Sequence, residues 1–254
     1  MIDVLPVYIG YDPREADAYA VCERSLRRHS NMALYVRKLH LNGLRQAGLY
    51  WREHEVNGHQ RIDKIDGLPF STDFSFSRFM VPELQNFDGW ACFVDCDFLF
   101  LDDIAEVAAL ADPSKAVMVC KQTHVPTAEI KMDDIAQTRY TRKNWSSFML
   151  FNCGHPANRD LTAKAVNSQT GRWLHGFGWL TSDLIGEIPS QWNWIEGVTD
   201  GEPKAVHYSE GGPWFKGYED CAYAQEWTRE WRLWRHDLHA NGPYNMATPR
   251  ELVA

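Results

Sequence analysis

Residues 90–101 read WACFVDCDFLFL, an apolar stretch that two carboxylates interrupt. The apolar run at residues 91–94 is short and lies among aromatic residues, a composition that predicts a buried strand. Side chains alternate between the two faces of a strand. We therefore expect Asp95 and Asp97 to point to the same side and Cys96 to point to the other.

The two carboxylates need a partner in such a setting. Like charges on one face repel each other, and both resist the loss of water. A divalent cation at a strand end would relieve this, because carboxylate oxygens suit Mg²⁺ or Mn²⁺, which in turn can hold a diphosphate. The alternative is a solvated turn with two exposed acids, and an Asp-x-Asp motif alone does not decide between them. The apolar runs on both sides favour the buried site.

Composition sets the class of protein. The chain has 254 residues, of which 44% are hydrophobic and 24% charged, as in globular proteins with a sizeable core. The net charge of −8 argues against a general nucleic-acid or anionic-membrane surface. Without a repeat or a linker, we expect a single domain over residues 1–254, with a flexible tail from about residue 241.

The cysteines and the N-terminus bear on location. The N-terminus lacks the basic and apolar regions of a signal peptide, and no apolar run reaches transmembrane length. The six cysteines are scattered, with no Cys-x-x-Cys pair. We therefore expect a cytoplasmic protein with reduced core cysteines and no integral membrane segment.

The N-terminal region predicts the fold class. Residues 4–9 form a strand pattern, and Gly10 and Tyr11 follow as a turn. Asp12 is a typical N-cap for a helix that runs to about His29, and residues 33–39 form a second strand pattern. Strand, helix and strand in this order indicate an α/β domain with a parallel sheet.

Ligands of such sheets bind at the carboxyl ends of the strands. Ile9, Gly10 and Tyr11 are therefore candidates for a nucleotide site. The alternative is that Tyr8 and Tyr11 only pack in the core, and position alone leaves both interpretations open.

The rest of the chain gives coarser expectations. We expect a polar connection with at most short helices at 41–70, helices at 75–87, 104–110 and 158–166, strands at 116–120, 147–151 and 204–208, and a long loop at 123–142. The aromatic residues between Trp173 and Trp194 favour core packing over sugar stacking.

Several motifs occur together in a characteristic order. They are Tyr8-Ile9-Gly10-Tyr11, Ser-Arg-Phe-Met-Val-Pro-Glu-Leu at 77–84, Asp95-Cys96-Asp97, residues 147–152, Asp183 in Ser-Asp-Leu-Ile, and His207 followed by Gly-Gly-Pro-Trp at 211–214. Over roughly residues 4–216 the chain resembles glycosyltransferases of the GT-A fold, most closely the retaining family 8 type that includes glycogenin and bacterial galactosyltransferases. The resemblance implies an α/β fold with a single Rossmann-like mixed central sheet flanked by helices.

The resemblance also implies a reaction. It is the metal-dependent transfer of a hexose from a nucleotide-sugar donor, usually a UDP-sugar, to a glycan, lipid or small-molecule acceptor, with retention of anomeric configuration. Asp95, Asp97 and His207 would hold Mn²⁺ or Mg²⁺, which neutralises the charge on the leaving UDP. A His ligand favours Mn²⁺ over Ca²⁺.

Further donor contacts follow from the same resemblance. Those expected to bind the donor are Tyr8, Ile9, Gly10 and Tyr11 at the uracil, Arg78 at the sugar or phosphates, and Asp95, Cys96, Gly211 and Lys216. Asp183 would lie at the anomeric carbon, where it would stabilise the positive sugar or act as the nucleophile.

The chain departs from the family pattern in three places. The family loop His-x-x-Gly-x-x-Lys-Pro-Trp is one residue shorter here, and Gly212 takes the place of the lysine, whose charge Lys216 could supply. The family's Asn-Ala-Gly is replaced by Trp145-Ser146-Ser147. A single aspartate, Asp183, stands where the family often has Asp-Gln-Asp.

Two other functions stay open. A nucleotidyltransferase would be expected to carry a Gly-rich, basic loop after its first strand, whereas residues 10–14 contain one Gly and one Arg. A non-catalytic protein that binds a nucleotide or glycan on the same fold is compatible with the departures above. Metal-dependent turnover distinguishes the enzyme from the binding protein.

Overall fold

The computed structural model of the chain describes residues 2–58, 60–122, 130–131, 135–136, 142 and 144–241. The loop predicted at 123–142 lies mostly outside these residues, and the tail after residue 241 lies outside them entirely. Among the described residues, no helix has the length and apolar character that crossing a bilayer requires.

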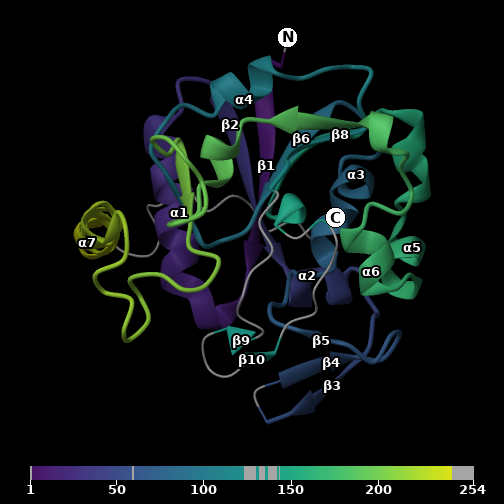
Figure 1. Cartoon of the computed structure of the whole chain (residues 1–254), viewed down its shortest axis with the longest axis horizontal. Helices are drawn as coiled ribbons and strands as arrows, with labels where there is room; N and C mark the ends of the chain where they lie inside the picture. The colour runs from purple at the N-terminus through teal and green to yellow at the C-terminus, as the bar shows by residue number, and fades with distance from the viewer. Residues whose placement is uncertain are drawn as a thin grey trace.

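A six-stranded sheet forms the centre of the molecule (Figure 1). In spatial order its strands are β12 (Ile185–Ile188), β8 (Val117–Cys120), β11 (Phe148–Asn152), β6 (Trp90–Val94), β1 (Val4–Tyr11) and β2 (Ala33–His40). All neighbours pair in parallel except β11, which runs antiparallel to both β6 and β8. The predicted mixed α/β sheet is confirmed.

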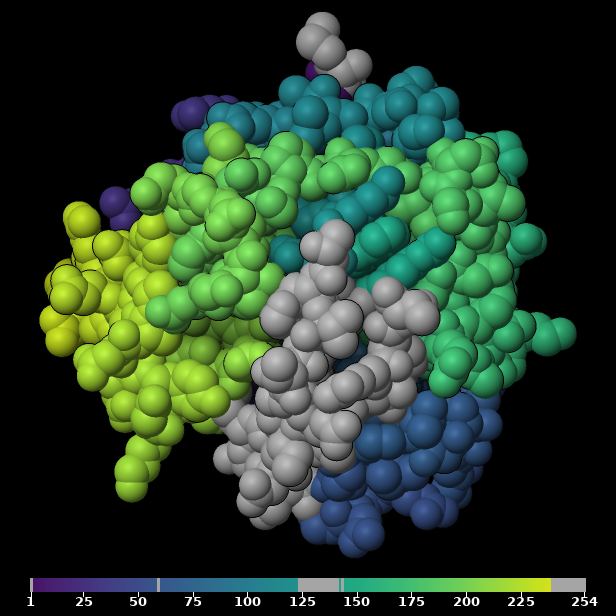
Figure 2. Space-filling view, in the orientation of Figure 1, coloured from purple at the N-terminus to yellow at the C-terminus, as the bar shows by residue number. Residues whose placement is uncertain are grey.

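Helices flank this sheet, as predicted. They are α1 (Ala16–His29), α2 (Leu41–Gln46), α3 (Val81–Leu84), α4 (Ala105–Ala109), α5 (Ala163–Ser168), α6 (Gly171–His175) and α7 (Ala224–Asn241). Short 3-10 turns are η1 (Pro13–Glu15), η2 (Ser77–Met80), η4 (Trp145–Ser147), η5 (Pro156–Asp160), η6 (Ser182–Leu184) and η7 (Ser190–Asn193). Figure 2 shows α7 on one flank, α5 and α6 on the opposite flank, and the region of residues 54–70 at the lower end.

Small antiparallel sheets complete the structure. β7 (Phe98–Phe100) pairs with β13 (Ala205–His207), and β9 (Ile130–Lys131) pairs with β10 (Ile135–Ala136). β3 (His54–Asn57), β4 (Gln60–Asp63) and β5 (Pro69–Phe70) form a third sheet. The expectation of an irregular connection at 41–70 is therefore wrong. A buried ion pair between Arg52 and Asp63, 2.7 Å from Nη2 to Oδ2, holds this polar region in place.

Other element boundaries also differ from expectation. β1 continues through Gly10 and Tyr11 instead of turning there, because both residues pair with β2. The helix predicted at 158–166 divides into η5 and α5, since Thr162 interrupts it and caps α5 by accepting the N–H of Ala165. The helix predicted at 75–87 is η2 followed by the single turn α3.

The chain turns directly from the end of β1 into η1 and α1, at the edge of the sheet where the parallel strands have their carboxyl ends. The Asp12 side chain accepts the N–H of Arg14 at 3.0 Å, so η1 begins directly after β1, and α1 follows. The inner face of α1 is apolar, with Tyr19, Cys22 and Leu26 buried in the main core. Ile9 of β1 lies beside Val94 of β6. The residues that follow these two strands therefore come together at one edge.

Candidate metal and donor site

Three potential metal ligands converge at this edge. Asp95 and Asp97 follow β6, and His207 is the last residue of β13, where it pairs with Phe98 of β7. One ligand atom from each of the three residues lies within 4.8 Å of the others. The Nε2 of His207 is 3.4 Å from Oδ1 of Asp97. The pairing of β7 with β13 thus brings together residues that are more than a hundred positions apart in sequence.

The backbone holds the two carboxylates firmly. The N–H of Asp95 donates to the carbonyl of Ser147 at 3.0 Å, and the carbonyl of Asp97 accepts the N–H of Tyr208 at 3.0 Å. Cys96 is fully buried, with its Sγ 3.8 Å from Oε2 of Glu15. Asp95 and Asp97 therefore converge while Cys96 points into the core, as predicted. The side chain of Cys96 therefore faces away from the cluster.

Asn193 orients the imidazole of His207. Its Nδ2 donates to the carbonyl of Asn144 at 3.0 Å, which fixes the amide so that Oδ1 faces Nδ1 of His207 at 2.7 Å. An amide oxygen only accepts, so Nδ1 carries the proton and the lone pair of Nε2 is directed toward the carboxylates. Phe98 stacks on the ring with centroids 4.4 Å apart. Sequence reasoning missed Asn193, which is marked only by its place between two tryptophans.

Arg78 lies beside the same cluster, where it pairs with one of the two carboxylates. Its Nη1 lies 2.8 Å from Oδ1 of Asp95 and donates to the carbonyl of Ser146 at 2.9 Å. The guanidinium rests over the rings of Phe74 and Phe93, and the side chain is buried. Arg78 therefore compensates one of the two negative charges and holds Asp95 in position.

The three potential ligand atoms suit a divalent cation. Two carboxylate oxygens and one imidazole nitrogen, with no thiolate among them, are ligands that Mn²⁺ accepts readily. The tautomer that Asn193 imposes leaves His207 with the nitrogen that a metal requires.

A curated relative identifies the family of this chain. No family model matches the sequence. Protein CDI of Arabidopsis thaliana is 45% identical over 231 residues, which cover 88% of this chain and 85% of that protein. The chain belongs to the Protein CDI family.

Solved structures show the fold of this CDI-family protein. An active-site mutant of LgtC has a TM-score of 0.56 at 13% identity, covering 89% of this chain and 95% of LgtC. The bifunctional glycosyltransferase WbbM has a TM-score of 0.56 at 14% identity, and GlyE of Streptococcus pneumoniae has 0.54 at 12%. The match to WbbM covers 91% of this chain and 52% of the WbbM chain. The match to GlyE covers 93% of this chain and 63% of the GlyE chain. The GT-A fold is therefore shown.

The end of β1 contributes less to the site than predicted. Tyr8 is buried, and its hydroxyl accepts Nε2 of Gln85 at 2.7 Å, which supports the packing interpretation. Ile9 is also fully buried. Gly10 lies under a core ring, since a Cβ there would be 2.5 Å from Cγ of Phe74. Tyr11 is half-buried and ends the strand, so it is the most accessible of the four.

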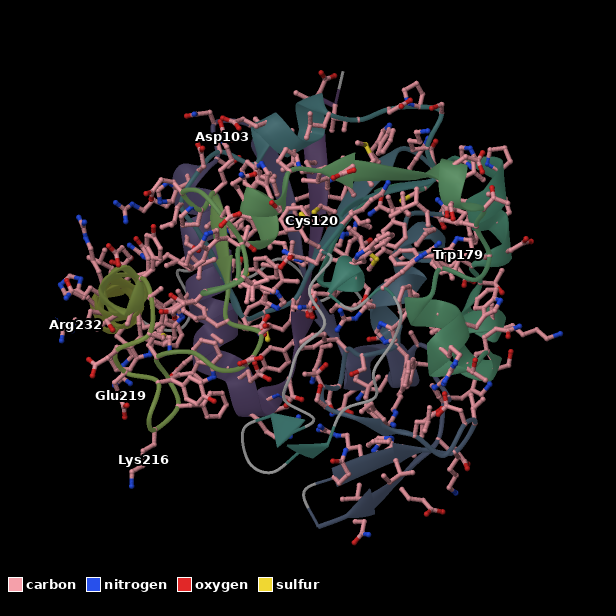
Figure 3. The ribbon with its side chains drawn as sticks, viewed as in Figure 1. Asp103, Cys120, Trp179, Lys216, Glu219 and Arg232 are labelled. Atoms are coloured by element: carbon pink, nitrogen blue, oxygen red, sulfur yellow. The ribbon has the colours of Figure 1, made fainter. Side chains whose placement is uncertain are left out.

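The loop after His207 has no lysine near the cluster. Gly211 is buried, and its N–H donates to the carbonyl of Tyr208 at 2.9 Å. Gly212 is covered by Trp214, because a Cβ there would lie 2.0 Å from Cζ3 of the indole. Lys216 is exposed and points away from the molecule (Figure 3). In this CDI-family chain neither position 212 nor Lys216 presents a charge to a diphosphate at the cluster.

Asp183 is not brought to the cluster. It precedes β12, which runs in the same direction as β6, so it lies at the amino edge of the sheet, whereas Asp95 lies at the carboxyl edge. Three strand spacings and about six residues of strand rise separate the two, which places them roughly 25 Å apart. Asp183 is exposed, and a hydrogen bond from Thr181 lowers the pKa of its carboxyl group. This position does not support the predicted role of Asp183 at the donor sugar.

His175 is a neighbour that sequence reasoning missed. Its Nδ1 lies 2.8 Å from Oγ of Ser146, the residue whose carbonyl binds Arg78. Burial lowers the pKa of His175 well below its usual value, and the charges of Arg78 and Arg52 lower it further. The imidazole is therefore neutral. A single histidine after a leucine gives no pattern from which this position could have been predicted.

Proposed function

We propose that this CDI-family protein is a divalent-metal-dependent glycosyltransferase that moves a sugar from a nucleotide-diphosphate donor, a UDP-sugar, to a hydroxyl acceptor. The observation that carries the proposal is the cluster of Asp95, Asp97 and His207 at the carboxyl edge of a GT-A sheet. One solved structure of LgtC, with a TM-score of 0.54 to this chain, holds donor and acceptor sugar analogs. This likeness supports a sugar donor as the ligand of this chain.

The charges of the cluster suit a diphosphate donor only when a cation is bound. Asp95, Asp97 and His207 would hold Mn²⁺ or Mg²⁺, which supplies the positive charge that stabilises a leaving diphosphate. Arg78 orients Asp95 through its contact at 2.8 Å. The net charge of −8 makes such local positive charge necessary for an anionic donor.

Retention is part of the proposal and is supported by the resemblance to family 8 enzymes. The acceptor hydroxyl attacks the anomeric carbon from the face that the diphosphate leaves. The bond from that carbon to the phosphate oxygen breaks, the bond to the acceptor oxygen forms, and the leaving phosphate takes the hydroxyl proton. This scheme requires no carboxylate base from the protein.

Calorimetric titration of UDP with and without Mn²⁺ tests the donor site. We expect micromolar binding only in the presence of Mn²⁺, followed by release of UDP from one of a panel of UDP-sugars. Asp97→Asn is expected to abolish the metal-dependent binding and leave the fold intact. Asp102→Asn is the matched control, because that carboxylate is exposed and pairs with Lys204 at 2.6 Å, away from the cluster. Absence of binding under both conditions would rule out the UDP donor.

A second candidate is a binding protein on the same fold. The observation that favours it is the loop at 211–216, which presents no lysine to the cluster. Binding of UDP with Mn²⁺, but without turnover of any UDP-sugar by hydrolysis or by transfer to glycans, lipids or small molecules, would favour this function.

The reducing cytoplasm is the location that we propose for the reaction. All six cysteines are free, and five of them are buried in the core. Thiols in this number persist in a reducing compartment.

A further inference from the structure

One turn is hydrogen-bonded both to Asp95 with its partner Arg78 and to the residue that orients His207, although it supplies no metal ligand itself. It consists of residues 144–147, Asn144-Trp145-Ser146-Ser147, and we call it the scaffold turn. On one side, the carbonyl of Ser146 accepts Nη1 of Arg78, which pairs with Asp95. The carbonyl of Ser147 accepts the N–H of Asp95 itself.

The other side of the scaffold turn reaches His207. The carbonyl of Asn144 accepts Nδ2 of Asn193 at 3.0 Å, and Oδ1 of the same amide is 2.7 Å from Nδ1 of His207. A shift of the turn would therefore move an anchor of Asp95 and the anchor of His207 together.

The conformation of the scaffold turn is specific. Asn144 has a φ of 64°, in the left-handed region that asparagine tolerates better than most residues. The indole N–H of Trp145 donates to the carbonyl of Gln122 at 2.9 Å. Ser146 and Ser147 are both buried. The turn is thus held between the sheet and the residues that follow β8.

His175 attaches the scaffold turn to α6. The Oγ of Ser146 is 2.8 Å from Nδ1 of His175. The imidazole packs edge-on against Phe79 of η2, with centroids 5.1 Å apart, and lies 6.1 Å from the ring of Phe76. The charged groups that lower the pKa of this ring are Arg78 and Arg52, which disfavour a further positive charge there. A neutral imidazole is therefore the form that Ser146 meets.

We propose that the scaffold turn, attached to α6 through Ser146 and His175, sets the geometry of the metal site on both its Asp95 side and its His207 side. His175 is then a positioning residue for a metal that it does not touch. The inference rests on the proposed metal-dependent function and extends it to residues that supply no ligand. Outer partners of metal ligands contribute about 10–100-fold to metal affinity.

The experiment measures Mn²⁺ affinity directly, by the electron paramagnetic resonance signal of free Mn²⁺ titrated with the full-length protein. His175→Leu and Ser146→Ala are each expected to weaken binding by about tenfold. The double variant is expected to bind no more weakly than His175→Leu, because His175→Leu alone already removes the hydrogen bond to Ser146. His175→Asn, which keeps a hydrogen-bonding atom at about the position of Nδ1, is expected to restore most of the affinity.

His54→Leu is the matched control. His54 is another half-buried histidine whose pKa is lowered by burial, but it lies in β3 against Phe70. It is expected to bind Mn²⁺ as the wild type does.

The outcomes separate the two proposals. A wild-type protein that does not bind Mn²⁺ would refute the metal site itself and with it the role of His175. A wild type that binds, with unchanged affinity in Ser146→Ala and His175→Leu, would overturn only the positioning role. A loss of thermal stability in His175→Leu without loss of affinity would show a structural role alone. Ser146→Ala removes a single hydroxyl, so it tests the inference even where His175→Leu does not fold.

Discussion

At the scale of single residues, Gly212 shows why the family lysine has no place here. A Cβ at this position would lie 2.0 Å from the ring of Trp214, which also contacts Tyr208 and Trp227. We expect Gly212→Ala to displace the indole and to lower the free energy of unfolding by about 1–3 kcal/mol. The measurement is urea unfolding followed by tryptophan fluorescence.

The control for this variant is Gly43→Ala in α2, where a Cβ would meet nothing within 4 Å. There the gain in helix propensity is expected to leave stability unchanged or raise it by up to about 1 kcal/mol. An unchanged unfolding midpoint in Gly212→Ala would contradict the packing that we describe.

Asp12 gives a prediction that depends on pH. Burial raises the pKa of this carboxyl group, but hydrogen bonds and charge from Arg14 outweigh burial and hold the pKa below its ordinary value. A lowered pKa in the folded state stabilises the protein above the unfolded value of about 3.9, and this stabilisation is lost as pH falls through the folded value. We expect Asp12→Asn to cost about 1–3 kcal/mol at pH 7.

The cost of Asp12→Asn should shrink below about pH 4, where the carboxyl group of the unfolded chain begins to take up a proton, and vanish as the pH falls through the lower folded-state pKa. Urea unfolding of both proteins at pH 7 and pH 3 measures the difference. The same cost at both pH values would show that Asp12 acts through its shape and capping geometry and not through its charge.

The site residues that lie in sequence motifs could be predicted from the sequence. Asp95, Asp97, His207 and Arg78 stand in motifs with fixed order, and the structure brings them together. Asn193 and His175 could not be predicted, because one polar residue among aromatic residues has no periodicity. The placement of Asp183 failed for the same reason, since one aspartate in a turn does not specify which edge of a sheet it occupies.

At the scale of elements, α7 is held to α1 by a buried carboxylate. Glu230 is 3% exposed, accepts Nε of Arg24 at 3.2 Å and pairs with Arg28, while Asp237 contacts Arg24 at 2.5 Å. Removing the charge leaves two cations beside a buried amide, so we expect Glu230→Gln to cost about 1–3 kcal/mol. Limited proteolysis of α7 is expected to become faster in this variant.

Because α7 lies at the flank of the molecule beside α1, Glu230→Gln should leave Mn²⁺ affinity unchanged (Figure 1). Glu226→Gln, on the exposed side of the same helix, is the control and should change neither property. Protection of α7 equal to that of the wild type would show that apolar contacts such as that of Trp227 suffice to hold the helix.

The predicted and observed strands show which elements a hydrophobic pattern can locate. Five of the six strands of the central sheet were predicted within one or two residues, and three of them, β6, β8 and β11, form buried, continuous apolar runs. The sixth strand, β12, was not predicted, because its four residues, Ile-Gly-Glu-Ile, form no such run. β3 and β4 were missed because most of their side chains are half-buried or exposed, so hydrophobic alternation is absent. Their position depends on the ion pair of Arg52 and Asp63, a contact between residues that no local pattern relates.

At the scale of the whole molecule, the protein is acidic, and its fold places two buried carboxylates at the carboxyl edge of the central sheet. Arg78 compensates one of the two like charges, and a bound cation would relieve the repulsion that remains between them. A ligand that binds only the folded state stabilises it by about 2.7 kcal/mol at a hundredfold excess over its dissociation constant. For a chain of this length that corresponds to a rise in Tm of about 5–10 °C.

We therefore expect saturating Mn²⁺ to raise the Tm of the wild type by this amount, and EDTA to reverse the rise. Asp97→Asn removes the repulsion together with a ligand, so its Tm without metal should equal or exceed that of the wild type, while its response to Mn²⁺ should vanish. Differential scanning calorimetry of both proteins, each with Mn²⁺ and with EDTA, measures the four values. An equal rise in both proteins would place the bound cation somewhere other than between Asp95, Asp97 and His207.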